Sequence, residues 1–166
     1  MTHQTKSASS HMPSEHMGKS HYGRLGIMTL LSFIAMYILM YAMVNALGNV
    51  LMNLNQFYMA GLMAAAMVLI ELALMSGMYH RKRLNALIAA AAVVAAVIFF
   101  LFIRRQTAIG DRQFLRSMIP HHGAAVLMCQ QAPLGNSEVQ RLCQTIVTNQ
   151  QAEIDQMKAI LRDLQD

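Results

Sequence analysis

Three long apolar runs occupy most of the first two thirds of the chain. They cover residues 25–47, 57–79 and 84–103, and the third run contains no charged residue. Each is close to the roughly 20 residues that a helix needs to cross a bilayer. Because so little polar chain remains to cover three such helices in a soluble core, the pattern predicts three transmembrane helices.

A different pattern begins after the third run, where polar residues become frequent and apolar residues recur at helical spacing. Pro120 is typical of the first turn of a helix, where its missing N–H does no harm. We expect that helix to run to about Ala132. Residues 133–136, with the sequence PLGN, predict a turn after it.

A second helix is predicted directly after this turn. Ser137 and Gln140 fit a capping box at its start, and apolar periodicity continues to about Leu164. Helices with so short a connection lie antiparallel, so residues 104–166 should form a helical hairpin. The chain is therefore predicted to be all-α, with three transmembrane helices before an extramembrane hairpin. The polar tail over residues 1–24 is disordered by composition.

The composition agrees with a membrane protein and adds one unusual feature. Hydrophobic residues make up 55% of the chain and charged residues only 13%, while methionine occurs 16 times. The net charge of +5 comes from basic residues beside the apolar runs, a placement typical of membrane topology. The sequence has neither an aromatic-interleaved basic patch nor a glycine-rich phosphate loop, so no nucleic-acid partner is expected.

The basic residues also predict the orientation in the membrane. The loop over residues 48–56 has no Lys or Arg, whereas the loop after the second run contains HRKR. If the amino terminus is cytoplasmic, the basic residues on that side are Lys6, Lys19, Arg24, Arg81, Lys82 and Arg83. Those on the other side are Arg104, Arg105, Arg112 and Arg116. This bias predicts a bacterial inner-membrane protein whose hairpin lies in the periplasm.

Candidate chemistry lies in the hairpin, where two adjacent histidines are flanked by methionines. If the first helix extends back past its proline, five side chains fall within an arc of about 120°. They are Met118, His121, His122, Met128 and Cys129. One face of the second helix carries Cys143, Ile146, Gln150, Glu153 and Met157. The two helices should then bring sulfur, imidazole, amide and carboxylate groups to one seam.

These donor types predict a soft metal. Thioethers bind Cu(I) and Ag(I) well and hard cations poorly, and imidazole binds copper in either oxidation state. The hairpin lacks the dense carboxylates of a Ca²⁺ or Mg²⁺ site and the paired Glu-x-x-His motifs of a di-iron bundle. We therefore expect copper, chiefly Cu(I), with Ag(I) as a second soft ion. The alternative is that these methionines and histidines only pack in a helical core.

The stretch FLRSMIPHHGAAVLM resembles the signature of the domain of unknown function 305 family, and IVTNQQAEIDQMKAIL resembles the second helix of that family. The resemblance covers about residues 111–161. It implies a ferritin-like helical arrangement and, in better understood members, periplasmic copper or silver binding linked to metal tolerance. The ligands that it implies here are Met118, His121, His122, Met128 and Met157. Gln150 and Glu153 are implied as groups that orient those ligands.

Two cysteines flank the predicted turn at similar distances, so they should lie opposite each other in an antiparallel hairpin. In an oxidising compartment Cys129 and Cys143 predict a disulfide between the helices. A thiolate contribution to a copper site and two unlinked buried thiols are the alternatives.

Other candidate groups lie in the tail and in the second apolar run. The tail either captures copper loosely or is simply solvated, and its candidate donors are His3, His11, Met12, His16, Met17 and His21. Glu71 is costly inside a bilayer, so it is a functional candidate unless it pairs with Asn45 or Asn85 of neighbouring helices. Methionines at four-residue spacing beside Glu71 make a metal path through the membrane a third hypothesis.

These observations predict a membrane-anchored Cu(I)- or Ag(I)-binding protein that captures metal outside the inner membrane, sequesters it or hands it on, and so contributes to metal tolerance. The sequence shows no nucleophile–base pair, so an enzyme is not expected. The alternative function is a structural membrane protein whose hairpin docks a partner. Because a two-helix hairpin buries little core, we expect it to pair with a second copy or to dock on a helical extension over residues 104–117.

Overall fold

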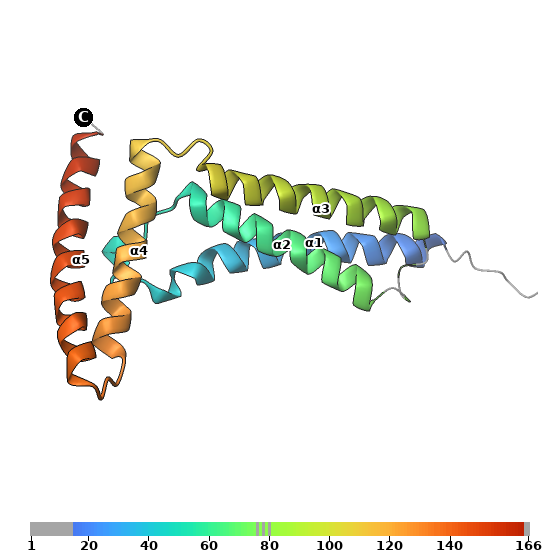
Figure 1. Ribbon diagram of the computed structural model, residues 1–166. Coiled ribbons are helices and arrows are strands. Elements are labelled where there is room, and N and C mark those ends of the chain that lie inside the picture. The colour runs from blue at the N-terminus through green and yellow to red at the C-terminus, as the bar shows by residue number, and fades with distance from the viewer. Residues whose placement is uncertain (1–14, 76, 78, 80, 165–166) are drawn as a thin grey trace, which may run out of the picture.

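The computed structural model describes residues 15–164 apart from Ser76, Met78 and His80, with side chains from His21 onward. Within these residues the chain is all-α, as predicted. The α-helices are α1 (Glu15–Leu39), α2 (Leu54–Leu74), α3 (Lys82–Arg105), α4 (Asp111–Gln131) and α5 (Ser137–Asp163), and the 3₁₀ helices are η1 (Met40–Met43) and η2 (Leu47–Asn49). Figure 1 shows α1, α2 and α3 running together, with the hairpin of α4 and α5 lying across one end of them.

Among the described residues, three helices are long and apolar enough to be candidate membrane spans, in line with the three apolar runs. They are His21–Met43, Leu54–Leu74 and Lys82–Arg105. The first and last residues of these helices differ from the predicted ones, and at the start of α2 the reason is a polar side chain. The second helix begins at Leu54 because the Asn53 side chain caps it, accepting a hydrogen bond from the Gln56 N–H at 3.0 Å.

The prediction of a disordered tail over residues 1–24 is wrong from Glu15 onward, where α1 begins, and residues 1–14 lie outside the described residues. Of the candidate donors in the tail, His3, His11 and Met12 lie outside the described residues, as do the side chains of His16 and Met17. His21 belongs to α1 and to the first candidate membrane span.

The helices α1, α2 and α3, with η1 as the end of the first span, are together called the membrane layer. α2 is its central helix and packs against both α1 and α3. Small residues dominate its buried positions, which are Tyr58, Ala60, Gly61, Ala64, Ala65, Val68 and Leu72. Small side chains let helices approach closely in a bilayer, where packing drives their association. A Cβ atom at Gly61 would lie only 2.5 Å from the Phe99 ring of α3, so this contact requires glycine.

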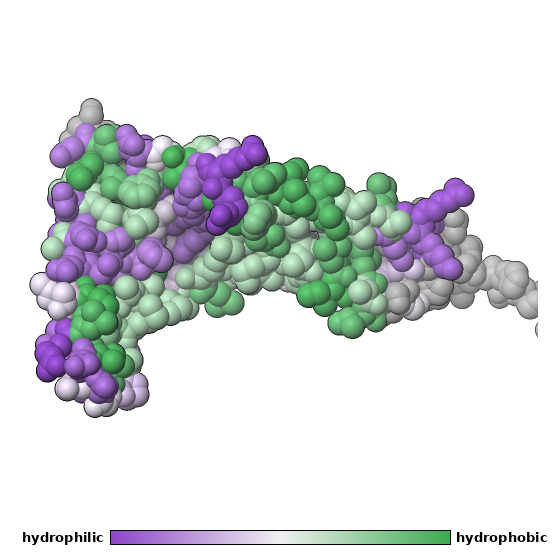
Figure 2. Space-filling view, in the orientation of Figure 1, coloured by the Kyte–Doolittle hydropathy of each residue, from purple (hydrophilic) through white to green (hydrophobic). Residues whose placement is uncertain are grey.

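The outer surface of the three membrane helices is apolar. Large exposed side chains there include Leu30, Leu31, Ile38, Leu74, Leu87 and Val94. Figure 2 shows a broad hydrophobic band over these helices, with hydrophilic residues at both ends of it. Such a surface is far larger than soluble proteins leave exposed, and it matches what lipid would cover. The arrangement indicates a membrane protein.

The connection between the first two spans, residues 44–53, carries several polar side chains and lies at the hairpin end of the membrane layer. It is called the platform loop below. Asn49 and Asn53 are buried in it. The Asn49 amide donates a hydrogen bond to Asn45 Oδ1 at 2.7 Å, and the Tyr41 hydroxyl donates one to the Leu51 carbonyl at 2.8 Å. These bonds pair polar groups that would otherwise be costly to bury, and they hold the loop in one shape.

The first hairpin helix is longer than predicted. α4 begins at Asp111, so Pro120 lies inside the helix and not in its first turn. An interior proline cannot donate to the carbonyl four residues earlier, and helices tolerate this only where other contacts compensate. Here Leu115 and Ile119, on the turn before the proline, are buried against α5. Tertiary packing therefore outweighs the local preference for a helix start.

The second hairpin helix is also capped differently from the prediction. Its cap is Asn136 and not Ser137, because Asn136 Oδ1 accepts hydrogen bonds from the N–H groups of Glu138 and Val139. Gln140 turns back and donates to the Leu134 carbonyl at 2.6 Å. The predicted antiparallel hairpin is nonetheless present, and the turn closes it.

The hairpin docks directly on the membrane layer. Leu51, from the platform loop, packs against the cluster of apolar residues between α4 and α5. Gly123 of α4 approaches the same loop so closely that an added Cβ atom would lie 2.6 Å from Asn45 Oδ1. The expected helical extension over residues 104–117 is absent as a single element, because Gln106 and Ala108 take positive φ angles and separate α3 from α4.

Candidate metal centre

Two faces of α4 pack against other parts of the protein, because this helix lies between α5 and the membrane helices. Toward α5 it presents residues at alternating spacings of four and three, namely Leu115, Ile119, His122, Val126 and Cys129. α5 has residues at the same alternating spacing, namely Cys143, Val147, Gln150, Ile154, Met157 and Leu161. This is the pattern of two helices packed along a narrow seam. Ile119, Val126 and Ile154 are almost fully enclosed in it.

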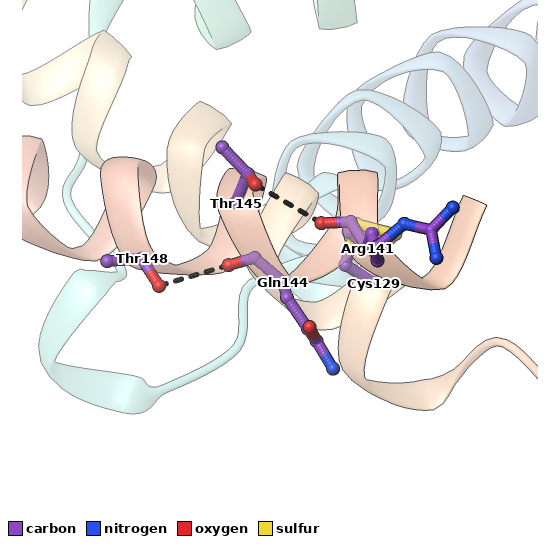
Figure 3. Close-up of a disulfide and its surroundings, with 6 residues drawn as sticks. Cys129, Arg141, Gln144, Thr145 and Thr148 are labelled. Atoms are coloured by element: carbon purple, nitrogen blue, oxygen red, sulfur yellow. Dashed lines mark hydrogen bonds between the residues drawn. A yellow bond between two sulfur atoms is a disulfide. The ribbon is translucent and has the colours of Figure 1, made fainter. Parts of the chain in front are cut away.

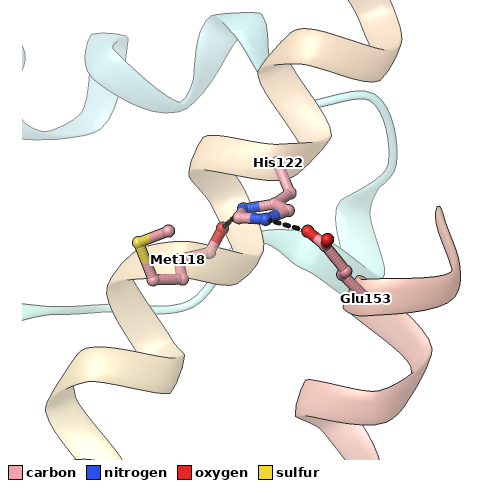
Figure 4. Close-up of polar contacts among 3 residues, drawn as sticks. All are labelled: Met118, His122 and Glu153. Carbon is pink, nitrogen blue, oxygen red and sulfur yellow. Dashed lines mark hydrogen bonds and ion pairs between the residues drawn. The ribbon is translucent and has the colours of Figure 1, made fainter. Parts of the chain in front are cut away.

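His122 is the buried polar residue that α4 contributes to this seam, and both its ring nitrogens have partners. Nδ1 lies 2.9 Å from the Met118 carbonyl oxygen, and Nε2 lies 2.7 Å from Glu153 Oε2 of α5. Figure 4 shows the imidazole between these two groups, with the Met118 side chain pointing away from Glu153. Only 8% of His122 is exposed. A buried polar group with two partners fixes the orientation of the ring.

The two contacts define the chemistry open to His122. A carbonyl oxygen only accepts, so the Nδ1–H group donates a hydrogen bond to the Met118 carbonyl. Nε2 is engaged in the short contact to Glu153 Oε2. Metal binding through Nε2 therefore requires Glu153 to move aside. The Glu153 side chain is 53% exposed, so it has solvent into which it can turn.

Met118 and His121 belong to the other face of α4, which lies over the membrane helices. Both line a cavity of about 380 Å³ between α4, η1 and the start of α2. Three further methionines line the same cavity, which is called the methionine cavity below: Met40, Met43 and Met59. The remaining lining includes amide side chains such as Asn53 and Gln56, and it contains no carboxylate. This donor set suits a soft cation and offers little to Ca²⁺ or Mg²⁺.

The prediction of one seam shared by all the donors is corrected by this geometry. Consecutive residues of a helix point about 100° apart, so adjacent histidines face different neighbours when the helix lies between two. His121 faces the membrane helices, whereas His122 faces α5. Their ring centroids are 6.2 Å apart.

The remaining predicted residues lie in separate surroundings. Met157 packs against the apolar cluster of the seam, which is the core role considered as the alternative. Met128 is 51% exposed and is absent from the lining of the methionine cavity. Gln150 is half-buried on α5, while Glu153 contacts His122 as expected of a group that orients a histidine. Among the described residues, no cluster of three His, Cys, Asp or Glu side chains has metal-binding geometry.

The two cysteines are joined in a disulfide between α4 and α5. Cys129 and Cys143 have Cα atoms 5.1 Å apart and are separated by 14 residues in sequence. Figure 3 shows the bond beside the first turns of α5, where the Thr145 and Thr148 hydroxyls donate to backbone carbonyls one turn earlier. Of the three alternatives, the structure has the disulfide, so neither sulfur is a free thiolate for metal.

Glu71 lies at the opposite end of the membrane layer, in the last turn of α2. Its Oε1 accepts a hydrogen bond from the Tyr79 hydroxyl at 2.8 Å, and not from Asn45 or Asn85 as expected. Asn85 instead donates to the Tyr79 carbonyl, while Asn45 belongs to the platform loop. Burial, together with the bond to Glu71, raises the pKa of Tyr79 to about 12, so its hydroxyl remains a donor at neutral pH.

The structure places Met40, Met43 and Met59 around one cavity with the hairpin donors, which the sequence pattern did not predict. The methionine spacing beside Glu71 predicts only a path through the membrane. The positions of the three methionines nevertheless carry a signal for this arrangement. Met40 and Met43 lie near the end of the first run and Met59 near the start of the second, so all three lie on the hairpin side of the membrane layer.

Comparison with known proteins identifies the family. The domain of unknown function 305 family (DUF305) matches residues 59–161, more than half of the chain. An uncharacterized protein of Acanthamoeba polyphaga mimivirus is 32% identical over 138 residues, which cover 81% of this chain and 89% of the viral protein. No solved structure matches the chain. The family match begins within α2 and so includes two membrane helices that the resemblance over residues 111–161 left out. The chain belongs to the DUF305 family.

Proposed function

We propose that this protein binds Cu(I) or Ag(I) at its hairpin, outside the inner membrane, and sequesters the ion or passes it on. The observation that carries the proposal is the methionine cavity, where Met118 and His121 of α4 face a space lined by sulfur donors and free of carboxylates. Thioether and imidazole ligands together favour a soft monovalent ion. Such binding would lower the free metal concentration and so contribute to metal tolerance.

The role proposed is binding and not catalysis. Both cysteines are held in the disulfide, and the polar groups around the cavity are thioethers, amides, one imidazole and the Ser117 hydroxyl. That hydroxyl donates a hydrogen bond to the Gln113 carbonyl at 2.8 Å and not to the imidazole, so it is not paired with a base that would activate it as a nucleophile. The five-ligand set implied by the family resemblance would need Glu153 to release His122 and would need Met128 and Met157 to leave their present surroundings.

Two observations support an outer-face location for the hairpin. The excess of basic residues favours a cytoplasmic amino terminus, and a disulfide persists in an oxidising compartment such as the periplasm. Fusion of alkaline phosphatase after Asp166 tests this orientation, because the enzyme becomes active only outside the cytoplasm. An active phosphatase fusion is expected. An inactive phosphatase fusion, together with fluorescence from a reporter protein that is fluorescent only in the cytoplasm and is fused at the same position, would contradict the orientation.

The binding proposal is tested on the full chain purified in detergent, by Cu(I) titration against a competing chelator under anaerobic conditions. His121→Ala and Met118→Leu should each weaken binding at least about tenfold, equivalent to about 1.4 kcal/mol. Met28→Leu is the matched control, since Met28 lies on α1 outside the lining of the cavity. Unchanged affinity in both cavity variants would contradict the proposal.

A second candidate function, docking of a partner by the hairpin, is favoured by a different observation. The hairpin leaves several large apolar side chains exposed: Phe114, Met128, Val139, Leu142, Ile160 and Leu164. A second copy could cover them and build the four-helix bundle that a ferritin-like arrangement needs. Light scattering of the detergent-solubilised chain tests this. A dimer that dissociates in Leu142→Glu, together with unaltered metal affinity in the His121 variant, would favour docking over metal binding.

A further inference from the structure

The methionine cavity is built by two parts of the chain that are far apart in sequence. The hairpin contributes Met118 and His121, while the membrane layer contributes Met40 and Met43 from η1 and Met59 from α2. Methionine is flexible enough to turn its thioether toward a ligand in an irregular space. Thioethers and imidazole are both good ligands for Cu(I) and Ag(I), so the two parts of the chain can share one site.

Hydrogen bonds hold α4 over the membrane helices and so keep these donors together. Asn55 of α2 donates to the Ser117 hydroxyl at 3.2 Å, and the Leu54 N–H donates to Gln113 Oε1 at the same distance. Ser117 is adjacent to Met118, and Asn55 is one turn before Met59. The donors on the two sides of the cavity are therefore anchored to each other.

The close approach of Gly123 fixes the other side of the contact. With no Cβ atom at this position, α4 lies against Val44 and Asn45, directly after η1. Gly123 follows His121 by two residues, and Val44 follows Met43 by one. The imidazole is thus brought to the end of the first membrane helix by a contact in which an added Cβ atom would displace the Asn45 side chain.

We infer that the membrane helices complete the metal site: Met40, Met43 and Met59 bind the same soft monovalent ion as Met118 and His121. This inference rests on the proposed function and assigns ligands outside the hairpin. It makes the membrane helices part of the binding site and not only an anchor. An ion bound here lies at the boundary between the aqueous hairpin and the lipid layer.

The test compares two triple variants of the full chain in detergent. One carries Met40→Leu, Met43→Leu and Met59→Leu, and the matched control carries leucine at Met63, Met67 and Met75, which are methionines of the membrane layer outside the lining of the cavity. Leucine keeps the volume and the apolar character of methionine, so both proteins should fold. The measurement is Cu(I) affinity by chelator competition, repeated with Ag(I), which undergoes no redox reaction with the competitor.

The cavity triple should bind at least about tenfold more weakly than the wild type, and the control triple should match the wild type. If His121→Ala weakens binding and the cavity triple does not, the inference is overturned while the proposed function stands. If neither weakens binding, both are overturned. If the triple loses its helical circular dichroism, Met59→Leu alone replaces it, with the loss of one sulfur neighbour in copper X-ray absorption as the expected result and an unchanged sulfur count as the contrary one.

Discussion

Gly123→Ala should loosen the contact between the hairpin and the membrane layer. The new Cβ atom would lie 2.6 Å from Asn45 Oδ1 and 3.4 Å from Val44 Cγ1. Asn45 cannot retreat without cost, because its Oδ1 accepts a hydrogen bond from the buried Asn49 amide at 2.7 Å. Either α4 moves away from the loop or this hydrogen bond breaks.

Opposing effects set the size of the change. In an unobstructed helix, replacing glycine by alanine stabilises by about 1 kcal/mol. Forcing an extra carbon into a filled contact costs about 1–3 kcal/mol, and breaking the hydrogen bond instead, which leaves a buried amide unpaired, also costs about 1–3 kcal/mol. Whichever cost applies, the gain in helix propensity offsets about 1 kcal/mol of it, so the free energy of unfolding should fall by up to about 2 kcal/mol.

The assay is thermal unfolding of the full chain in detergent. For a chain of this length each kcal/mol lowers the midpoint by about 2–4 °C. Gly26→Ala in α1 is the matched control, because nothing lies within 4 Å of a Cβ atom there, and it should be neutral or stabilising. Cu(I) affinity should also fall in the Gly123 variant, since the cavity depends on the same contact. A Gly123 variant as stable and as tight-binding as the control would refute the reasoning.

Three further predictions concern other parts of the chain. Cys129→Ser opens a 14-residue loop and should lower the free energy of unfolding by about 3 kcal/mol, and reductant should lower the thermal midpoint of the wild type but not of the variant. His122→Ala should lower the midpoint more than His121→Ala and weaken Cu(I) binding less, because His122 is held in the seam by Glu153; the reverse order would place the metal in the seam. Tyr79→Phe removes the hydroxyl that donates to the buried carboxylate of α2 and should destabilise by about 1–3 kcal/mol in the same assay, so an unchanged midpoint would mean that this bond contributes little.

The membrane layer and the hairpin could be predicted from the sequence because long apolar runs determine the first and helical apolar spacing determines the second. The helix ends were harder to predict. Pro120 suits a helix start, but the burial of Leu115 and Ile119 against α5 makes α4 begin before it. Ser137 suits a cap as well as Asn136 does, but Ser137 is already helical, and Asn136, whose backbone is extended, is the residue whose side chain accepts from the first N–H groups.

The site could be predicted only in part, for a geometric reason. A helical wheel places residues on one helix but does not say how many neighbours that helix has. His121 and His122 both fell on the predicted arc, yet α4 lies between α5 and the membrane layer, and the two rings face different partners. The contribution of Met59 depends on how the hairpin lies across the membrane helices. That arrangement is set by Gly123 and Leu51, which carry no distinctive signal of their own.

The first coordination shell of bound copper tests the central claim most directly, namely that Met118 and His121 hold a soft metal. Copper X-ray absorption of the Cu(I)-loaded full chain should show sulfur neighbours and a nitrogen neighbour in the wild type. The nitrogen should disappear in His121→Ala, and one sulfur should disappear in Met118→Leu. A shell of oxygen and nitrogen alone, unchanged by either substitution, would contradict the account.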